Sequence, residues 1–270
     1  ELGRQERRTA ALIRRRLEEL GVEYVPLADT GTAAVIRGAK PGRTIGFRAD
    51  IDALPITEET GLPYASQTPG VMHACGNDFH TAALLGAAEL LQKRRGELAG
   101  NVKLFFQPDE EGDGGAARMI AEGCMENPHV DAMLCCHVES GIPAGTVSVK
   151  SGPIAAASNP FAVTVRGRGT HGAKPHLGTD VIVAGAQMVT ALQTISSRRT
   201  SPTEPVVVTV GSFHSGTAGN VLPEEAKFTG ILRTMGGGAR ERVKNDFRAI
   251  VSGIAAAMDL EAEIEIFESY

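Results

Sequence analysis

The hydrophobic pattern of the first half of the chain predicts alternating helices and short strands. An opening helix over residues 5–20 places Ala10, Ile13, Leu17 and Leu20 at helical spacing, and Gly21 ends it. The elements predicted after it are strands at 24–27, 33–37 and 44–48, a helix at 82–92, a strand at 101–107, a helix at 116–122 and a strand at 130–136. Strands separated by helices indicate an α/β fold with a mostly parallel sheet.

From residue 159 the pattern changes. Its predicted elements are a strand at 161–165, a helix at 181–195, strands at 206–212 and 226–233, a helix at 239–257 and an acidic alternating strand at 261–267. This β-α-β-β-α-β order predicts an α+β domain of the ferredoxin-like kind. We place the boundary in the small-residue stretch before residue 159, which gives one domain over residues 1–157 and a second over 158–270.

The stretch at residues 71–81, V-M-H-A-C-G-N-D-F-H-T, combines a thiol, two imidazoles, an amide and a carboxylate. The predicted helix follows at once, with Asn77 or Asp78 placed to cap it. Cys75 would then precede a helix N-terminus, which favours a thiolate. A thiolate beside imidazoles binds Zn²⁺, or Mn²⁺ where carboxylates dominate. A buried structural cysteine among capping residues is the alternative interpretation.

Three predicted strands end in residues that can bind a metal. The first carries Asp50 and Asp52 at its end, the second Glu110 and Glu111, and the third His137. The carboxyl ends of parallel strands lie at the same edge of a sheet, so these side chains are expected to converge near Cys75.

The adjacent Glu110 and Glu111 are the most informative pair. Neighbouring carboxylates repel each other unless a cation separates their roles. With a metal present, one ligates it while the other acts as general base on the attacking water. Without a metal, two solvated loop glutamates are the simpler interpretation.

Composition narrows the function without naming it. The net charge of −5, the pI near 5.9 and the 4% aromatic content without tryptophan argue against nucleic-acid binding. No apolar run is long enough to span a membrane. The four cysteines (75, 124, 135 and 136) lack a C-x-x-C pattern, which favours reduced thiols and a cytoplasmic location.

Seven segments together carry a family resemblance that runs essentially end to end. They are R-A-D-I-D-A-L-P (48–55), M-H-A-C-G-N-D-F-H-T-A (72–82), F-F-Q-P-D-E-E-G (105–112), C-H-V (136–138), G-T-H-G-A-K-P-H (169–176), G-N-V-L-P (219–223) and L-R-T (232–234). In this order they resemble the amidohydrolase branch of the M20 metallopeptidases, which includes hippurate hydrolases, N-acyl-amino-acid deacetylases and auxin-conjugate hydrolases.

The resemblance implies a zinc-peptidase-like catalytic domain with two divalent metal ions (Zn, Mn, Co or Ni) and an inserted lid domain that also forms a homodimer. The implied substrate is an N-acyl amino acid, cleaved to a carboxylate and a free amino acid. The roles that it implies are Cys75, Glu111 and His137 as metal ligands, Glu110 as general base, Asp50 as a residue that orients the site, His171 as oxyanion stabiliser, and Asn220 and Arg233 as substrate-binding residues.

Two departures from the family pattern support a second hypothesis. Asn77 occupies the position of a metal-ligating histidine, and an amide oxygen is a weaker ligand than imidazole. The chain also resembles an incomplete version of the family, cut at both ends and lacking a later ligand. A catalytically impaired relative that retains binding and dimerisation, with reduced metal occupancy, is therefore the alternative function. A non-enzymatic interaction module built on the second domain is the third hypothesis.

Overall fold

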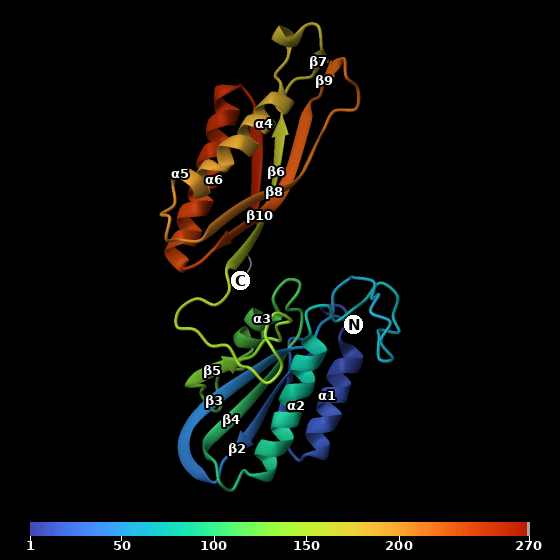
Figure 1. Cartoon of the computed structure of the whole chain (residues 1–270), viewed down its shortest axis with the longest axis vertical. Coiled ribbons are helices and arrows are strands. Elements are labelled where there is room, and N and C mark those ends of the chain that lie inside the picture. Colours follow the sequence, from blue (N-terminus) through green and yellow to red (C-terminus); the bar gives the residue numbers. More distant parts are fainter. Residues whose placement is uncertain (269–270) are drawn as a thin grey trace. The chain divides into compact units, whose positions relative to one another are not determined.

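The computed structural model of the chain describes residues 1–268, and its contacts fall into two units, Glu1–Val147 and Ser148–Tyr270. Residues 269 and 270, at the end of the predicted second domain, lie outside the described part. Each unit has its own sheet, which Figure 1 shows, and its own buried core. No helix within the described residues is both long and apolar enough to cross a membrane.

The first unit contains a five-stranded mixed sheet. Its strands, in the order β1-β2-β4-β3-β5, are β1 (Glu23–Leu27), β2 (Gly31–Arg37), β4 (Ala99–Gln107), β3 (Lys40–Asp50) and β5 (Ala132–Cys135). Strand β3 runs parallel to both β4 and β5, which confirms the predicted α/β class. The β1–β2 and β2–β4 pairs are antiparallel. For β1 and β2 the reason is that the three residues between them are too few for a crossover.

Three helices cover the two faces of this sheet. Helices α1 (Arg7–Glu19) and α2 (Asn77–Lys93) lie on one face (Figure 1), where Ile13, Leu84 and Phe106 are among the residues of the main core. The next residue back along β4, Phe105, points to the opposite face, because successive strand side chains alternate. There it packs in a smaller cluster with Met119 of α3 (Gly115–Ala121).

The second unit has the predicted ferredoxin-like arrangement. Its antiparallel sheet has the order β11-β6-β10-β8, from β11 (Glu261–Ile266), β6 (Ala157–Arg166), β10 (Glu225–Thr234) and β8 (Val206–Ser215). The remaining elements are α4 (Val181–Leu192), α5 (Thr194–Arg198), α6 (Gly237–Ala257), a 3₁₀ turn at Pro175–Leu177, and the two-stranded sheet of β7 (Thr170–His171) and β9 (Val221–Leu222).

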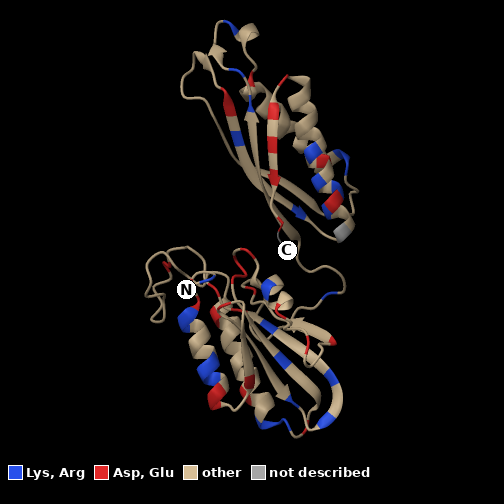
Figure 2. Ribbon diagram, turned by 180° about the vertical axis from the view of Figure 1, so that it is seen from behind, with Lys and Arg blue, Asp and Glu red and all other residues tan. Residues whose placement is uncertain are grey.

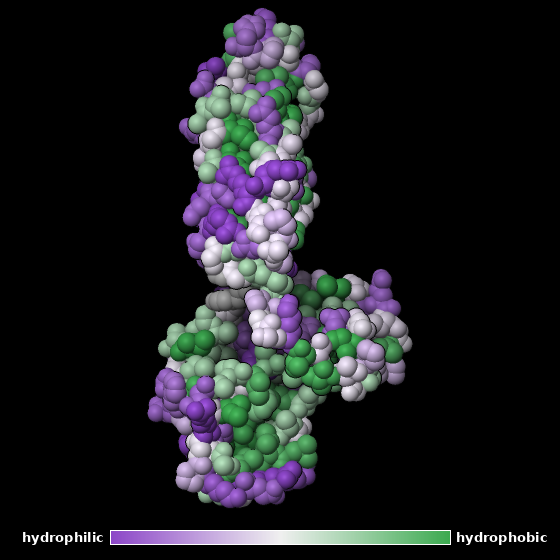
Figure 3. All heavy atoms as spheres, turned by 60° about the vertical axis from the view of Figure 1, so that its left-hand side comes forward, coloured by the Kyte–Doolittle hydropathy of each residue, from purple (hydrophilic) through white to green (hydrophobic). Residues whose placement is uncertain are grey.

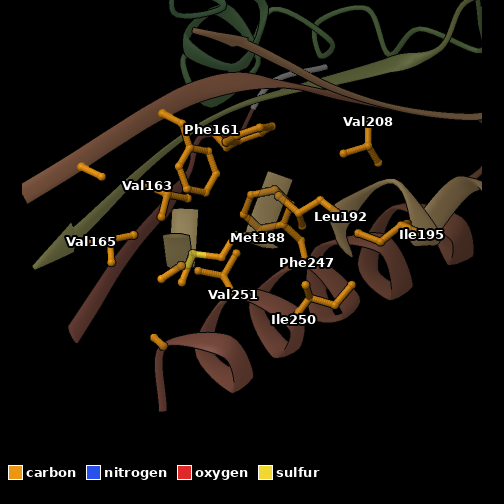
Figure 4. Close-up of a cluster of buried hydrophobic side chains, with 14 of the residues drawn as sticks. Phe161, Val163, Val165, Met188, Leu192, Ile195, Val208, Phe247, Ile250 and Val251 are labelled. Atoms are coloured by element: carbon orange, nitrogen blue, oxygen red, sulfur yellow. The ribbon is translucent and has the colours of Figure 1, made fainter. Parts of the chain in front are cut away.

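The core of the second unit lies between its sheet and its helices. The rings of Phe161 from β6 and Phe247 from α6 pack with centroids 4.5 Å apart, beside Met188 of α4 (Figure 4). Strand β11 alternates exposed glutamates with more buried apolar residues, and Figure 2 shows the glutamates as red bands along the strand. This period of two is the pattern of a strand with one face toward the core.

Strand β5 forms one edge of the first sheet, and all four of its residues are exposed. Two of them, Met133 and Leu134, are large and apolar. Figure 3 shows other hydrophobic residues on the surface of the same unit. The edge residues nearest the candidate site therefore receive little support from packing.

A buried lysine on β4 ties the sheet to the turns that follow α3. Lys103 is 5% exposed, and its ammonium donates to the carbonyl oxygens of Cys124, Glu126 and Pro128 at 2.7, 2.5 and 3.2 Å. Burial lowers the pKa of Lys103. Since its hydrogen bonds replace those that water would make, the charge is tolerated inside the unit.

We predict that Lys103→Met leaves these carbonyls without their donor and lowers the free energy of unfolding by about 1–3 kcal/mol. Urea denaturation followed by circular dichroism measures the change. Lys93→Met is the matched control, because Lys93 is 67% exposed and forms only an ion pair with Glu89 within its own helix. Equal stability losses in the two variants would contradict the assigned role of Lys103.

Candidate active site

The candidate site forms where three parallel strands end beside the start of a helix. Asp50 at the end of β3 pairs in register with Gln107 at the end of β4, and β5 ends at Cys135 on the other side of β3. Asn77 is the first residue of α2. The loops that leave these ends carry the acidic, thiol and imidazole groups, as expected for a site in an α/β sheet.

Asp52 organises the loop after β4. This carboxylate is 1% exposed, and its two oxygens accept hydrogen bonds from the backbone N–H groups of Glu110 and Glu111 at 2.9 and 3.0 Å. Burial raises the pKa of Asp52, and the two N–H donors oppose that rise. From the sequence, Asp52 was expected only as one of the carboxylates that converge at this edge of the sheet, not as an anchor of the loop. Its signal was the D-I-D pattern, which places Asp50 and Asp52 at the same strand end.

The four residues predicted to bind metal lie close together. The sulfur of Cys75 is 3.3 Å from Nε2 of His137, and the amide nitrogen of Asn77 donates to Oε1 of Glu111 at 3.3 Å. The same nitrogen donates to the carbonyl oxygen of Asp52 at 3.0 Å. Asn77 is 1% exposed, and its side-chain oxygen is buried without a hydrogen-bond partner.

Two sequence-based expectations about this segment are wrong. Gly76, with φ of 89°, is the residue that precedes α2, and neither Asn77 nor Asp78 caps the helix; the Asn77 side chain contacts Glu111 instead. Nor does the helix N-terminus favour a thiolate in the metal-free protein. Burial, the hydrogen bond to Glu111 and the nearby carboxylates together raise the pKa of Cys75 to about 12.

Arg48 is the positive charge among these carboxylates. Its guanidinium lies 2.9 Å from Oδ2 of Asp50 and 3.8 Å from Oε1 of Glu110, and its Nε donates to Gln107 at 2.8 Å. Burial raises the pKa of Glu110, Glu111 raises it further, and Arg48 opposes the rise. A raised carboxyl pKa suits a group that takes up and releases a proton near neutral pH.

His80, one of the two imidazoles in the 71–81 stretch, lies deep in the site. It is 6% exposed, its Nδ1 lies 2.7 Å from Oδ1 of Asp50, and its Nε2 accepts from the backbone N–H of Val138 at 2.9 Å. His80 follows Asn77 by three residues, so both side chains face the sheet. That spacing was the available sequence signal.

The candidate residues of the second unit lie in two separate regions. His171 on β7 lies beside Asn220, whose carbonyl oxygen accepts from the N–H of Gly172 at 2.7 Å. Arg233 lies near the far end of β10, eight residues beyond Glu225, which corresponds to roughly 26 Å of strand. The structure therefore groups His171 with Asn220, and Arg233 does not join them within this unit.

The donor set around Cys75 fits a divalent cation in its chemistry. Thiolate, imidazole and carboxylate are the ligands that zinc and its neighbours take, and the unpartnered oxygen of Asn77 adds a neutral donor. Within residues 1–268, no group of three or more His, Cys, Asp or Glu side chains is arranged to hold a metal ion in this conformation. Small side-chain adjustments would therefore accompany binding.

A family model for peptidase family M20/M25/M40 matches residues 46–268, and the chain belongs to this family. It is 44% identical over 266 residues to an N-acetyl-L-cysteine deacetylase of Bacillus subtilis, covering 98% of the chain and 64% of that protein. It is 40% identical over 272 residues to an N-acyl-L-amino acid amidohydrolase of Geobacillus stearothermophilus, covering all of the chain and 73% of that relative.

Among solved structures, the chain resembles a dinuclear metal binding peptidase of the M20 family from Bacillus subtilis. The TM-score is 0.83 at 39% identity, and the match covers 99% of the chain and 69% of that structure. The chain thus spans roughly two thirds to three quarters of the length of these three relatives. The predicted family and fold class are confirmed.

We predict that Asp52→Asn lowers the free energy of unfolding by roughly 1.5–3 kcal/mol, because an amide offers an acceptor to one of the two N–H groups and a donor to the other. Hydrogen exchange should quicken at the amides of Glu110 and Glu111 in particular. Asp113→Asn is the control, since Asp113 is 75% exposed and pairs with Arg4 at the surface. Unchanged exchange at both glutamates would show that Asp52 does not hold the loop.

Proposed function

We propose that the protein containing this chain is a metal-dependent amidohydrolase that cleaves N-acyl amino acids to a carboxylate and a free amino acid. Family membership and the two relatives that act on acylated amino acids support this proposal. The observation that carries it is the meeting of Cys75, Glu111 and His137 beside Glu110, because metal-assisted hydrolysis of an amide combines a set of metal ligands with an adjacent base.

Cys75, Glu111 and His137 would hold a divalent cation such as zinc, manganese, cobalt or nickel, and the oxygen of Asn77 would contribute weakly. When bound, such a cation supplies a Lewis acid for the amide carbonyl and lowers the pKa of a water molecule. A second cation is supported by the related dinuclear peptidase. The residues of this chain then have the tasks of orienting the groups and moving the proton.

Glu110 is the proton carrier of the proposal. Its side chain is 37% exposed, so it reaches solvent and substrate, while its backbone N–H is fixed by Asp52. As general base, its carboxylate takes the proton of the attacking water and passes it to the leaving amine. Burial and the neighbouring Glu111 raise the pKa of Glu110, which favours the protonated form needed for the second transfer.

The second unit is proposed to bind substrate and to form a homodimer. His171 would stabilise the developing oxyanion, and Asn220 and Arg233 would hold the carboxylate and amide groups of the substrate. Since Arg233 lies far along β10 from the other two, they would belong to different parts of a substrate site. We also propose a cytoplasmic location, which the four free cysteines support.

Asn77 supports a second candidate, a relative with weakened metal binding. Its amide nitrogen, a donor, faces Glu111, where an imidazole would offer a ligating nitrogen. An amide oxygen binds zinc-like cations less well than imidazole does. The two candidates share the fold and the cluster and differ in how much cation the site holds.

We predict that Glu110→Gln lowers kcat for N-acetyl amino acids by roughly 10²–10⁴-fold, since it removes the base. The release of free amino acid measures the rate, and the cation content should stay unchanged because Glu110 is not a proposed ligand. Glu97→Gln, at an exposed pair with Arg94, is the control. A fully active Glu110→Gln enzyme would contradict the assigned base.

Asn77→His separates the two candidate functions. If Asn77 weakens the site, the histidine variant should bind cations roughly 10–100-fold more tightly and hydrolyse substrate faster. Metal content after dialysis and the rate of amino acid release measure both effects. Full cation loading and full activity of the unaltered protein, with no gain in the variant, would rule out the impaired relative.

A further inference from the structure

His137 needs support that regular structure does not supply. Strand β5 ends at Cys135, and residues 136–147 form neither helix nor strand. The side chain of His137 is exposed, yet its Nε2 lies 3.3 Å from the sulfur of Cys75. Some other contact must keep this segment against the first turn of α2.

Val138 makes that contact. Its backbone N–H donates to Nε2 of His80 at 2.9 Å. Its side chain packs on Gly76, where an added Cβ would lie only 2.4 Å from a methyl group of Val138. The rings of His80 and His137 also meet edge to face, with centroids 4.7 Å apart. The residue next to His137 is therefore anchored to α2 by one hydrogen bond and one close packing contact.

The hydrogen bonds of His80 fix its orientation. Because Nε2 accepts from Val138, the proton lies on Nδ1, which donates to Oδ1 of Asp50 at 2.7 Å. The other oxygen of Asp50 pairs with Arg48 at 2.9 Å. A continuous line of contacts thus runs from Arg48 through Asp50 and His80 to the backbone of Val138.

We propose that His80 is a positioning residue, which acts through the Val138 N–H to hold His137 where it binds a divalent cation. This inference rests on the proposed function in one respect, the assignment of His137 as a ligand. Residues that orient a metal ligand without touching the metal commonly change its affinity 10–100-fold. Asp50 belongs to the same line, as the partner that keeps the His80 ring in the correct tautomer.

Two substitutions of His80 each remove one of its two hydrogen bonds, to Asp50 or to the N–H of Val138. His80→Gln places a side-chain oxygen near the former Nε2 and keeps an acceptor for Val138, whereas His80→Asn keeps a donor near Asp50 and loses that acceptor. Zinc affinity of the chelator-stripped chain is measured by competition with a chromophoric chelator, and stability by urea denaturation. His129→Asn, at a histidine 69% exposed, is the control.

We expect both variants to lose similar stability but to differ in zinc affinity. His80→Gln should bind within about threefold of the unaltered chain, and His80→Asn about 10–100-fold more weakly. Equal affinities in the two variants, whether both are kept or both are lost, would overturn the proposal, as would an unaltered chain that binds no zinc. If the two variants differ in zinc affinity as expected but the unaltered protein hydrolyses no substrate, the role of His80 stands. In that case only the proposed function is refuted.

Discussion

A buried carboxylate that binds two consecutive backbone amides is the interaction on which the candidate site depends. Asp52 receives the N–H groups of Glu110 and Glu111 and thereby fixes the one segment that carries both acidic groups. Two adjacent glutamates on a free loop would separate to reduce their repulsion. Anchoring the backbone rather than the side chains leaves each carboxylate able to face a different partner, Arg48 on one side and the Cys75 cluster on the other.

The electrostatic balance of the site favours the binding of a cation. The carboxyl groups of residues 50, 110 and 111 all contribute to the raised pKa of Cys75, and Arg48 is the cation that the structure places among them. In the metal-free protein the thiol of Cys75 therefore keeps its proton. A divalent cation would reverse this balance, because it favours the thiolate and separates the negative charges.

Much of this arrangement could be predicted from the sequence, since it follows from chain direction. Parallel strands end at one edge, so apolar runs followed by Asp50, Glu110 and His137 had to bring these residues near one another. The sheet begins with an antiparallel pair because the connection between β1 and β2 is short. The prediction of a mostly parallel sheet did not take this short connection into account. The ferredoxin-like order of the second unit follows equally directly from its periodicity.

The residues that sequence reasoning missed act through partners distant in the chain. His80 depends on Asp50, thirty residues earlier, and on a backbone N–H fifty-eight residues later, so helical periodicity alone could not separate its role from packing. Asparagine is a common helix-capping residue, but the side-chain amide of Asn77 instead donates a hydrogen bond to Glu111, which is distant in the sequence. For Cys75, the sequence showed only the nearby helix N-terminus, which lowers a thiol pKa. The carboxylates that raise the pKa of Cys75 follow other strands.

The central claim is that Cys75, Glu111 and His137 bind one cation together. X-ray absorption spectroscopy of the zinc-loaded protein tests it most directly, because a sulfur ligand is distinguished from nitrogen and oxygen by its distance. If the three residues share the ion, the spectrum shows one sulfur at about 2.3 Å with nitrogen and oxygen ligands completing the shell, and Cys75→Ser loses that sulfur. A shell of nitrogen and oxygen alone in the unaltered protein would contradict it.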